Sequence, residues 1–185
     1  MNRQLRVFAD EDELGYCVAR EIVQGLETAL ADGRFFLVGA PSGRTPRSTY
    51  RALASVLRER VELDLSRLVI VMMDDYVVPD PHTGLLRRVP VELPYSCEGF
   101  GRREILDAIN AGRDDAGMPA ANLWFPDPSD PAAYDARIEA SGGIDFFILA
   151  TGKSDGHVAF NPPGSEISSR TRIVDLPLET RTDNL

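Results

Sequence analysis

The sequence has few of the residues that mark several classes of protein. Its two cysteines, Cys17 and Cys97, lie far apart and without metal-ligand spacing, so we expect a reducing compartment and no disulfide scaffold. No apolar run approaches the length that crosses a membrane, and the first residues lack the long apolar stretch of a signal peptide. These absences predict a soluble, cytoplasmic protein without a membrane partner.

Positive charge is also scarce. The chain has 20 Lys and Arg against 29 Asp and Glu, a net charge of −9. A nucleic-acid-binding surface needs clustered basic residues, so we expect no nucleic-acid partner. Any anionic ligand must be held by local donors against an unfavourable overall field. A length of 185 residues, with no repeat or linker, predicts one domain with a buried core over residues 1–185.

Apolar runs alternate with helical patterns along the chain. Continuous apolar residues predict short strands at 5–9, 35–39, 68–73, 122–125 and 144–150. Periodic apolar positions predict helices over 11–31, 45–58, 95–111 and 127–140, the second with Pro46 at its first position. Residues 77–94 are rich in Pro and Arg and indicate a surface loop. This alternation predicts a three-layer α/β, Rossmann-like fold, with a mostly parallel sheet covered by helices on both faces.

The stretch GAPSGRTP follows one of the predicted strands and precedes a helix. Its small residues permit close backbone approach, and Ser42 and Thr45 supply hydroxyl groups beside Gly43. Backbone N–H groups and a helix N-terminus together form a cradle for phosphate. A loop of this composition also serves as a simple turn, so the pattern alone leaves both interpretations open.

Two acidic motifs follow other predicted strands. Asp74 and Asp75 come directly after an apolar run, where burying a carboxylate is costly unless it is exposed to solvent or has a function. For one of the two, capping a turn or carrying a solvated charge is a sufficient role. Asp155 and His157 lie two residues apart and reach one cleft if the turn is tight; the alternative is a capping Asp and a half-buried His. The neighbouring Gly-Lys-Ser is not a nucleotide-binding P-loop, because Phe147 occupies the position of its first glycine.

Taken together, the stretches GAPSGRTP, MMDDYVVP and SDGHVAFNPPGS resemble motifs of the glucosamine-6-phosphate deaminase/isomerase family, in the same order and with similar spacing. The resemblance covers nearly the whole chain. The related 6-phosphogluconolactonases share the phosphate loop and the Asp-Gly-His. Tyr76 and the Ala-Phe-Asn that ends at Asn161 favour the deaminase side.

The resemblance implies roles for individual residues. Asp74 would be the base that moves a proton between C2 and C1 during aldose–ketose isomerisation, and His157, oriented by Asp155, would assist opening of the sugar ring. The resemblance also implies contacts with the substrate phosphate at Ser42, Gly43, Arg44 and Thr45, with the substrate at Asp75, Tyr76 and Asn161, and with an effector phosphate at Arg172. The implied partner is a small sugar phosphate, with no metal and no organic cofactor.

The sequence departs from the family pattern in ways that keep alternatives open. The family's Glu after Asn is Pro162 here, and Lys153 stands where a glycine belongs. A lactone hydrolase in which His157 activates water, and a non-catalytic sugar-phosphate sensor, therefore remain alternatives. An Arg and a Lys that complete the phosphate site in the family would lie beyond Leu185, so we expect the chain to lack the C-terminal part of its domain.

Two further expectations concern Cys97 and assembly. Cys97 stands near a predicted helix start, where a lowered thiol pKa can arise, but a structural role is the expected one. The sequence does not decide between a monomer and a homo-oligomer.

Overall fold

The computed structural model describes residues 5–113, 117–154 and 156–184. Its strands are β1 (Phe36–Ala40), β2 (Leu68–Met72), β3 (Val77–Pro79), β4 (Leu86–Arg88), β5 (Leu123–Trp124) and β6 (Phe146–Phe147). Its α-helices are α1 (Glu11–Ala31), α2 (Arg47–Arg58), α3 (Cys97–Phe100), α4 (Asp107–Asn110), α5 (Pro131–Ala140) and α6 (Leu178–Asn184). Within the described part of the chain, no helix is long and apolar enough to cross a membrane.

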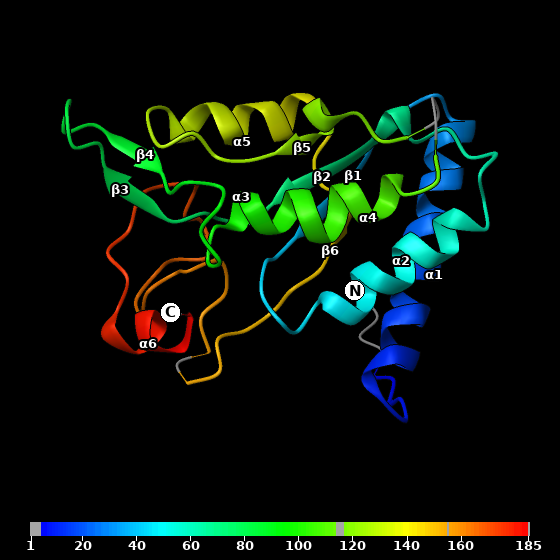
Figure 1. Cartoon of the computed structure of the whole chain (residues 1–185), viewed down its shortest axis with the longest axis horizontal. Coiled ribbons are helices and arrows are strands. Elements are labelled where there is room, and N and C mark those ends of the chain that lie inside the picture. The colour runs from blue at the N-terminus through cyan, green and yellow to red at the C-terminus, as the bar shows by residue number, and fades with distance from the viewer. Residues whose placement is uncertain (1–4, 114–116, 155, 185) are drawn as a thin grey trace.

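The central sheet is parallel and has the strand order β5-β2-β1-β6. Helices α1, α2 and the α3–α4 region lie on one side of it and α5 lies on the other (Figure 1). The predicted α/β fold, with a parallel sheet between helical layers, is confirmed.

Both faces of the sheet are buried, which explains the continuous apolar strands. Successive side chains of a strand point to opposite faces. Ile70 and Met72 of β2 therefore pack in the core under α1 and α2, whereas Val69 and Val71 pack with Tyr134 of α5. An alternation of apolar and polar residues is typical of a sheet with one face in solvent. All residues of β1 and β2 are buried, so neither strand shows that alternation.

Helix α1 is the longest element and begins as the sequence predicts. Asp10 accepts a hydrogen bond from the Glu13 amide at 2.8 Å, and the Glu13 carboxylate accepts one from the Ala9 amide at 2.8 Å. These contacts satisfy N–H groups that the first helical turn leaves without partners. Gly15 permits close packing on α2, because a Cβ there would lie 2.6 Å from the Ser48 backbone carbon.

Several predicted elements differ from the structure. Residues 5–9 do not form a strand; they pair with no strand of the described sheets, and Leu5 and Val7 are exposed. The predicted loop 77–94 contains the antiparallel β3–β4 hairpin. The predicted helix 95–111 begins at Cys97 and includes a π-helical stretch at Gly101–Leu106. Strand pairing in the predicted run 144–150 is limited to Phe146 and Phe147, and the segment then leaves the sheet.

Candidate active site

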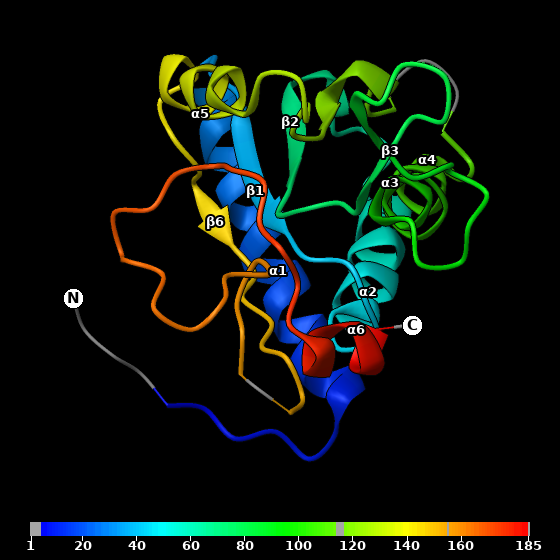
Figure 2. The same ribbon diagram turned by 90° about the vertical axis from the view of Figure 1, so that its left-hand side faces the viewer.

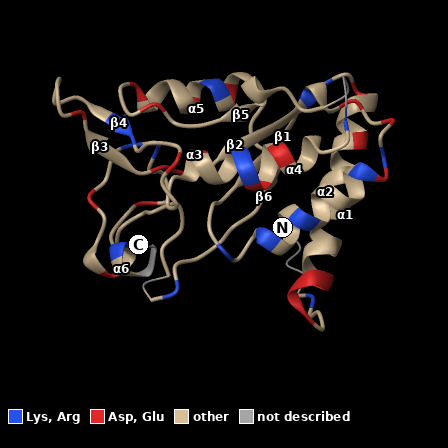
Figure 3. Ribbon diagram, viewed as in Figure 1, with Lys and Arg blue, Asp and Glu red and all other residues tan. Residues whose placement is uncertain are grey.

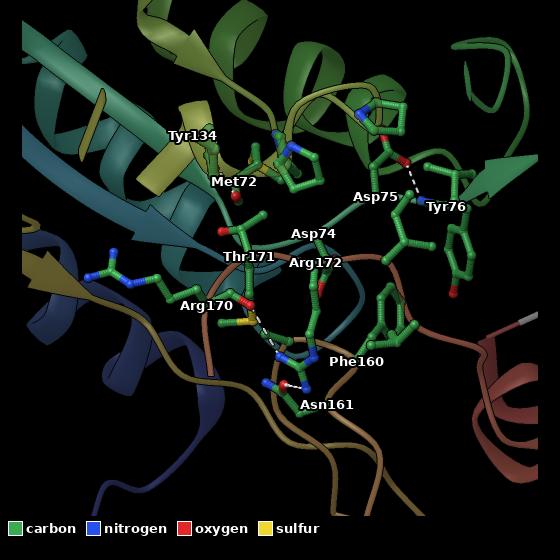
Figure 4. A pocket seen from close by; sticks show the side chains of 18 of the residues that line it. Met72, Asp74, Asp75, Tyr76, Tyr134, Phe160, Asn161, Arg170, Thr171 and Arg172 are labelled. Atoms are coloured by element: carbon green, nitrogen blue, oxygen red, sulfur yellow. Dashed lines mark hydrogen bonds between the residues drawn. The ribbon is translucent and has the colours of Figure 1, made fainter. Parts of the chain in front are cut away.

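A pocket of about 990 Å³ opens at the carboxyl ends of the parallel strands, between them and the segment 159–176. Asp74 comes from the end of β2, and Tyr76 from the start of the hairpin that follows. Phe160, Asn161 and Arg172 line it from the later part of the chain (Figure 4). Open α/β sheets bind their ligands outside the carboxyl ends of the strands, so this is the expected location of a site.

Asp74 has the most perturbed carboxyl group of the pocket. Burial raises its pKa from 3.8 to about 7, and the neighbouring charge of Asp75 adds to this rise. A hydrogen bond from the Cys97 thiol, 3.5 Å from the Asp74 Oδ1, and the charge of His157 act in the opposite direction. A carboxyl group with a pKa near neutrality can both take up and release a proton at physiological pH, as an acid–base catalyst must.

Asp75, in contrast, has a structural role. Its Oδ1 accepts hydrogen bonds from the amides of Tyr76 at 2.8 Å and Cys97 at 3.0 Å. Its Oδ2 accepts one from the Glu98 amide at 3.1 Å. Asp75 thus holds the start of α3 against the end of β2, even though it also borders the pocket. The two adjacent carboxylates therefore differ in their partners, because Asp75 accepts three backbone hydrogen bonds and Asp74 accepts one from the Cys97 thiol.

Replacing Asp75 with Asn is therefore expected to weaken the fold. The amide group would set an N–H donor against at least one of these backbone N–H donors, so a hydrogen bond is lost. We expect a loss of about 1–3 kcal/mol in the free energy of unfolding, measured by denaturant titration. An unchanged stability would contradict the structural role of Asp75.

The predicted phosphate loop joins β1 to α2. Gly43 has the left-handed φ of 101°, and Gly43, Arg44 and Thr45 are exposed, so their backbone and side chains are open to solvent. These residues do not line the pocket described above. The Ser42 Oγ lies 3.1 Å from the Cys97 Sγ, and this sulfur lies 3.5 Å from the Asp74 Oδ1. Cys97 therefore connects the loop with Asp74. Figure 2 shows the loop running from β1 into α2.

His157 belongs to the loop that follows β6, and its predicted partner Asp155 lies outside the described residues. The charge of His157 is one of the causes that lower the pKa of Asp74. Its ring also lies 5.5 Å from the Phe160 ring. Ala159 and Phe160 both have a left-handed backbone, with φ of 53° and 54°. Such conformations are costly for residues other than glycine and concentrate at functional sites.

Asn161 and Arg172 form a polar group across the pocket from the strand ends. The Arg172 Nη2 donates hydrogen bonds to the Asn161 Oδ1 at 3.0 Å and the Ser165 Oγ at 2.9 Å. In the described structure, all hydrogen-bond acceptors of the Arg172 guanidinium are uncharged, and this guanidinium forms no ion pair. The segment is held on α5, since Thr171 donates to the Asp135 carboxylate from its amide at 3.1 Å and its hydroxyl at 2.8 Å.

Comparison with known proteins identifies the family. The family model described as "Glucosamine-6-phosphate isomerases/6-phosphogluconolactonase" matches residues 9–174. The chain belongs to this family. Among its relatives is a glucosamine-6-phosphate deaminase of Streptomyces avermitilis, 38% identical over 148 residues, or 80% of this chain and 52% of that protein. Another, from Porphyromonas gingivalis, is 33% identical over 179 residues, or 96% of this chain and 63% of that protein.

Solved structures of the family share the fold. A monomeric glucosamine-6-phosphate deaminase is similar with a TM-score of 0.78 and 22% identity, over 98% of this chain and 68% of that one. A 6-phosphogluconolactonase of Trypanosoma brucei is similar with a TM-score of 0.56 and 20% identity, over 94% of this chain and 69% of that one. The chain spans about half to two thirds of the length of the curated deaminases it matches.

Cys97 contacts both the predicted phosphate loop and the predicted base, and the sequence does not predict these contacts. This residue is buried, and burial with the nearby Asp74 and Asp75 raises its thiol pKa well above the ordinary value. The lowered pKa that a helix start can produce is absent. The position of Cys97 at a helix start does not indicate that its thiol lies between Ser42 and Asp74.

The pocket also contains aromatic residues that the sequence predicts only in part. Tyr76 was predicted at the substrate, and its ring lies 5.0 Å from that of Phe160 and 5.6 Å from that of Tyr95. Phe160 belongs to the Ala-Phe-Asn motif, whereas nothing in the sequence indicates a role for Tyr95. Among the described residues, no group of three or more His, Cys, Asp or Glu side chains is arranged to hold a metal ion.

Proposed function

We propose that this protein is an aldose–ketose isomerase or deaminase that acts on a hexose or amino-hexose 6-phosphate, with Asp74 as the base at C2. The family and the deaminase relatives support the class of substrate. The observation that carries the proposal is the Asp74 carboxyl group, which borders the strand-end pocket with a pKa raised to about 7.

The isomerisation is a proton transfer between neighbouring carbons. In the ring-opened sugar, the ionised Asp74 takes the C2 proton, an enediol forms, and the same group returns the proton to C1. In an amino sugar the intermediate would be an enolamine, and protonation at C1 would give a C2 imine, to which water adds at C2 before ammonia leaves and the ketose forms. His157 would assist ring opening before this step, with Asp155 as its proposed orienting partner.

The β1–α2 loop is the proposed phosphate site. Arg44 supplies a cation, Ser42 and Thr45 supply hydroxyl groups, and no acidic residue lies in the first turn of α2. The helix N-terminus therefore offers N–H groups and a favourable dipole to an anion. The loop is anchored by the Tyr50 hydroxyl, which donates to the Pro41 carbonyl at 2.6 Å.

A sugar phosphate is accordingly expected to raise the melting temperature, whereas the same sugar without phosphate is not. A ligand that binds only the folded state stabilises it by mass action, and the phosphate supplies the contacts of the loop. Thermal denaturation with glucosamine 6-phosphate and glucosamine at equal concentrations makes the comparison. Equal shifts for both would remove the loop from the site.

The alternatives are a 6-phosphogluconolactonase-like hydrolase, in which His157 activates water, and a sugar-phosphate sensor without catalysis. The structural likeness to lactonases keeps the first in view, and Pro162 in place of the family's Glu keeps the second. A panel of hexose and amino-sugar phosphates separates the three. Release of ammonia or formation of ketose supports the proposal, loss of lactone supports hydrolysis, and binding without turnover supports the sensor.

An effector-phosphate site at Arg172 also remains a proposal. The uncharged partners of this guanidinium leave its charge available to an anion. Because Arg172 borders the same pocket as Asp74, an anion bound there would act directly on the catalytic face. The cytoplasmic location stays a prediction.

A further inference from the structure

The Cys97 side chain lies against the proposed base at the end of β2. Its Sγ is 3.5 Å from the Asp74 Oδ1 and 3.1 Å from the Ser42 Oγ, and the residue is only 1% exposed. The Cys97 amide donates to the Asp75 Oδ1 at 3.0 Å, so the backbone of this residue is also fixed, at the start of α3. The sulfur therefore meets Asp74 from one fixed position.

The available protons determine the direction of these hydrogen bonds. A thiol has one proton and an ionised carboxylate only accepts, so the thiol is the donor to Asp74. Burial raises the pKa of the Cys97 thiol well above its ordinary value, so this proton stays on the sulfur while Asp74 titrates. The sulfur is left to accept from the Ser42 hydroxyl. A charged carboxylate is a stronger acceptor than a hydroxyl, so Asp74 remains the partner of the thiol proton.

The two oxygens of Asp74 differ in their surroundings. Oδ1 accepts the thiol hydrogen bond, whereas Oδ2 accepts no hydrogen bond from the described residues. Among those residues, the Arg113 Nε is the only buried side-chain nitrogen or oxygen without a partner, so Oδ2 is not sealed from solvent. Because Asp74 is half-buried and borders the strand-end pocket, Oδ2 opens into that pocket.

Resting on the proposed function of Asp74, we propose that Cys97 is a positioning residue that holds the Asp74 carboxylate by Oδ1, so that Oδ2 takes the C2 proton of the substrate. The torsion about the Cβ–Cγ bond of an aspartate is broad, so the carboxylate plane turns easily unless it is held. A base must lie within hydrogen-bond reach of the proton that it takes, and a small misplacement is costly in rate. A fixed donor on one oxygen keeps the other oxygen aimed at the substrate.

The same hydrogen bond affects the strength of the base. A hydrogen bond donated to the ionised form of a carboxyl group lowers its pKa, and the thiol bond of Asp74 opposes the larger effect of burial. Removal of the thiol should therefore raise the pKa of Asp74 further. The other titratable groups whose charges act with that of Asp74 are Asp75, His157, Tyr50, Tyr76 and Tyr134.

The first test needs no enzymatic activity. The carboxyl carbon of Asp74, labelled with ¹³C and assigned by its loss in Asp74→Asn, is titrated by NMR. In Cys97→Ala we expect the acid dissociation constant of Asp74 to fall roughly two- to tenfold, because one hydrogen bond to the ionised form is lost. Cys97→Ser keeps a donor and should recover much of this change, and it replaces the alanine variant if that variant folds poorly. Cys17→Ala, at the other cysteine of the chain, should leave the titration unchanged.

The second test measures the aim of the carboxylate. At alkaline pH, where Asp74 is ionised in every variant, Cys97→Ala should exchange the substrate C2 proton about tenfold or more slowly at saturating substrate. KM should change little, because Cys97 does not line the pocket. In Cys97→Ser the rate should lie closer to that of the wild type. A residue with only a packing role would reduce stability without slowing exchange in the molecules that remain folded.

The outcomes separate the positioning role from the proposed function. An Asp74 titration that is equal in the wild type and Cys97→Ala overturns the positioning role, and so does C2 exchange at alkaline pH that is unchanged in Cys97→Ala. An Asp74 titration that depends on Cys97, in a protein that does not exchange the C2 proton, supports the hold of Cys97 on Asp74 and rejects the isomerase.

Discussion

Asp74→Asn is expected to abolish exchange of the substrate C2 proton with solvent, with a loss in rate of about 10²–10⁴ or more. The amide keeps the shape of the side chain but cannot take up a proton, so isomerisation stops while phosphate binding survives. Incorporation of deuterium at C2 in D₂O, followed by NMR, measures the loss. Asp75→Asn is the matched control at the neighbouring carboxylate. If Asp75→Asn stops exchange and Asp74→Asn does not, the base is assigned one residue too early.

The same variant should also change stability in a direction opposite to that of Asp75→Asn. A carboxyl group whose pKa rises from 3.8 to about 7 on folding binds more protons in the folded state across that interval, so it reduces stability as pH increases through it. Above pH 7 the ionised Asp74 costs up to about 4 kcal/mol. Asp74→Asn removes this cost, so it should melt at a higher temperature than the wild type at pH 8 and show a smaller difference at pH 4.

Pro162→Glu is expected to increase turnover of ring-closed glucosamine 6-phosphate by about 10²–10⁴, the usual contribution of a positioned acid–base group. The resemblance implies a Glu at this position, whose carboxylate would help the histidine transfer the ring-opening proton. Pro162 lies in the same loop as His157 and is half-buried, but it can neither accept nor donate that proton. Rates with ring-closed and largely open-chain phosphates, measured side by side, show whether the gain is selective for the closed ring.

The neighbouring Pro163 provides the control for this gain. It is exposed, so Pro163→Glu adds the same charge to the same loop without placing it at the family's position. Brisk turnover of glucosamine 6-phosphate by the wild type would show that another group opens the ring. An inactive wild type that Pro162→Glu does not rescue would favour the sensor or a different substrate.

Much of the fold could be predicted because both faces of the sheet are covered. The apolar runs of β1 and β2 follow from that burial, and the Asp10 cap marks the start of α1. Residues 5–9 show the limit of the same reasoning, because a short apolar segment becomes a strand only if a sheet edge is available to it. The extent of β6 likewise depends on where its backbone stays beside β1, which its composition does not determine.

The site could be predicted in its location but not in its division of roles. The carboxyl ends of parallel strands meet at one edge, so Asp74, Asp75 and the β1–α2 loop were expected to lie near each other. Which Asp is the cap depends on α3, whose Cys97 and Glu98 amides reach Asp75 from more than 20 residues further along the chain. A pKa raised by burial depends in the same way on packing by distant segments. The residues adjacent to Asp74 in the sequence therefore do not determine its pKa.

The pH dependence of C2 proton exchange at substrate concentrations well below saturation, which reports the free enzyme, tests the identity of the base most directly. The ionised form of Asp74 takes the proton, so exchange should be slow below its pKa, rise with pH through about 7, and be absent at every pH in Asp74→Asn. A wild-type profile that is already complete near pH 4, where an ordinary carboxyl group ionises, would contradict this account. So would exchange that persists unchanged in Asp74→Asn.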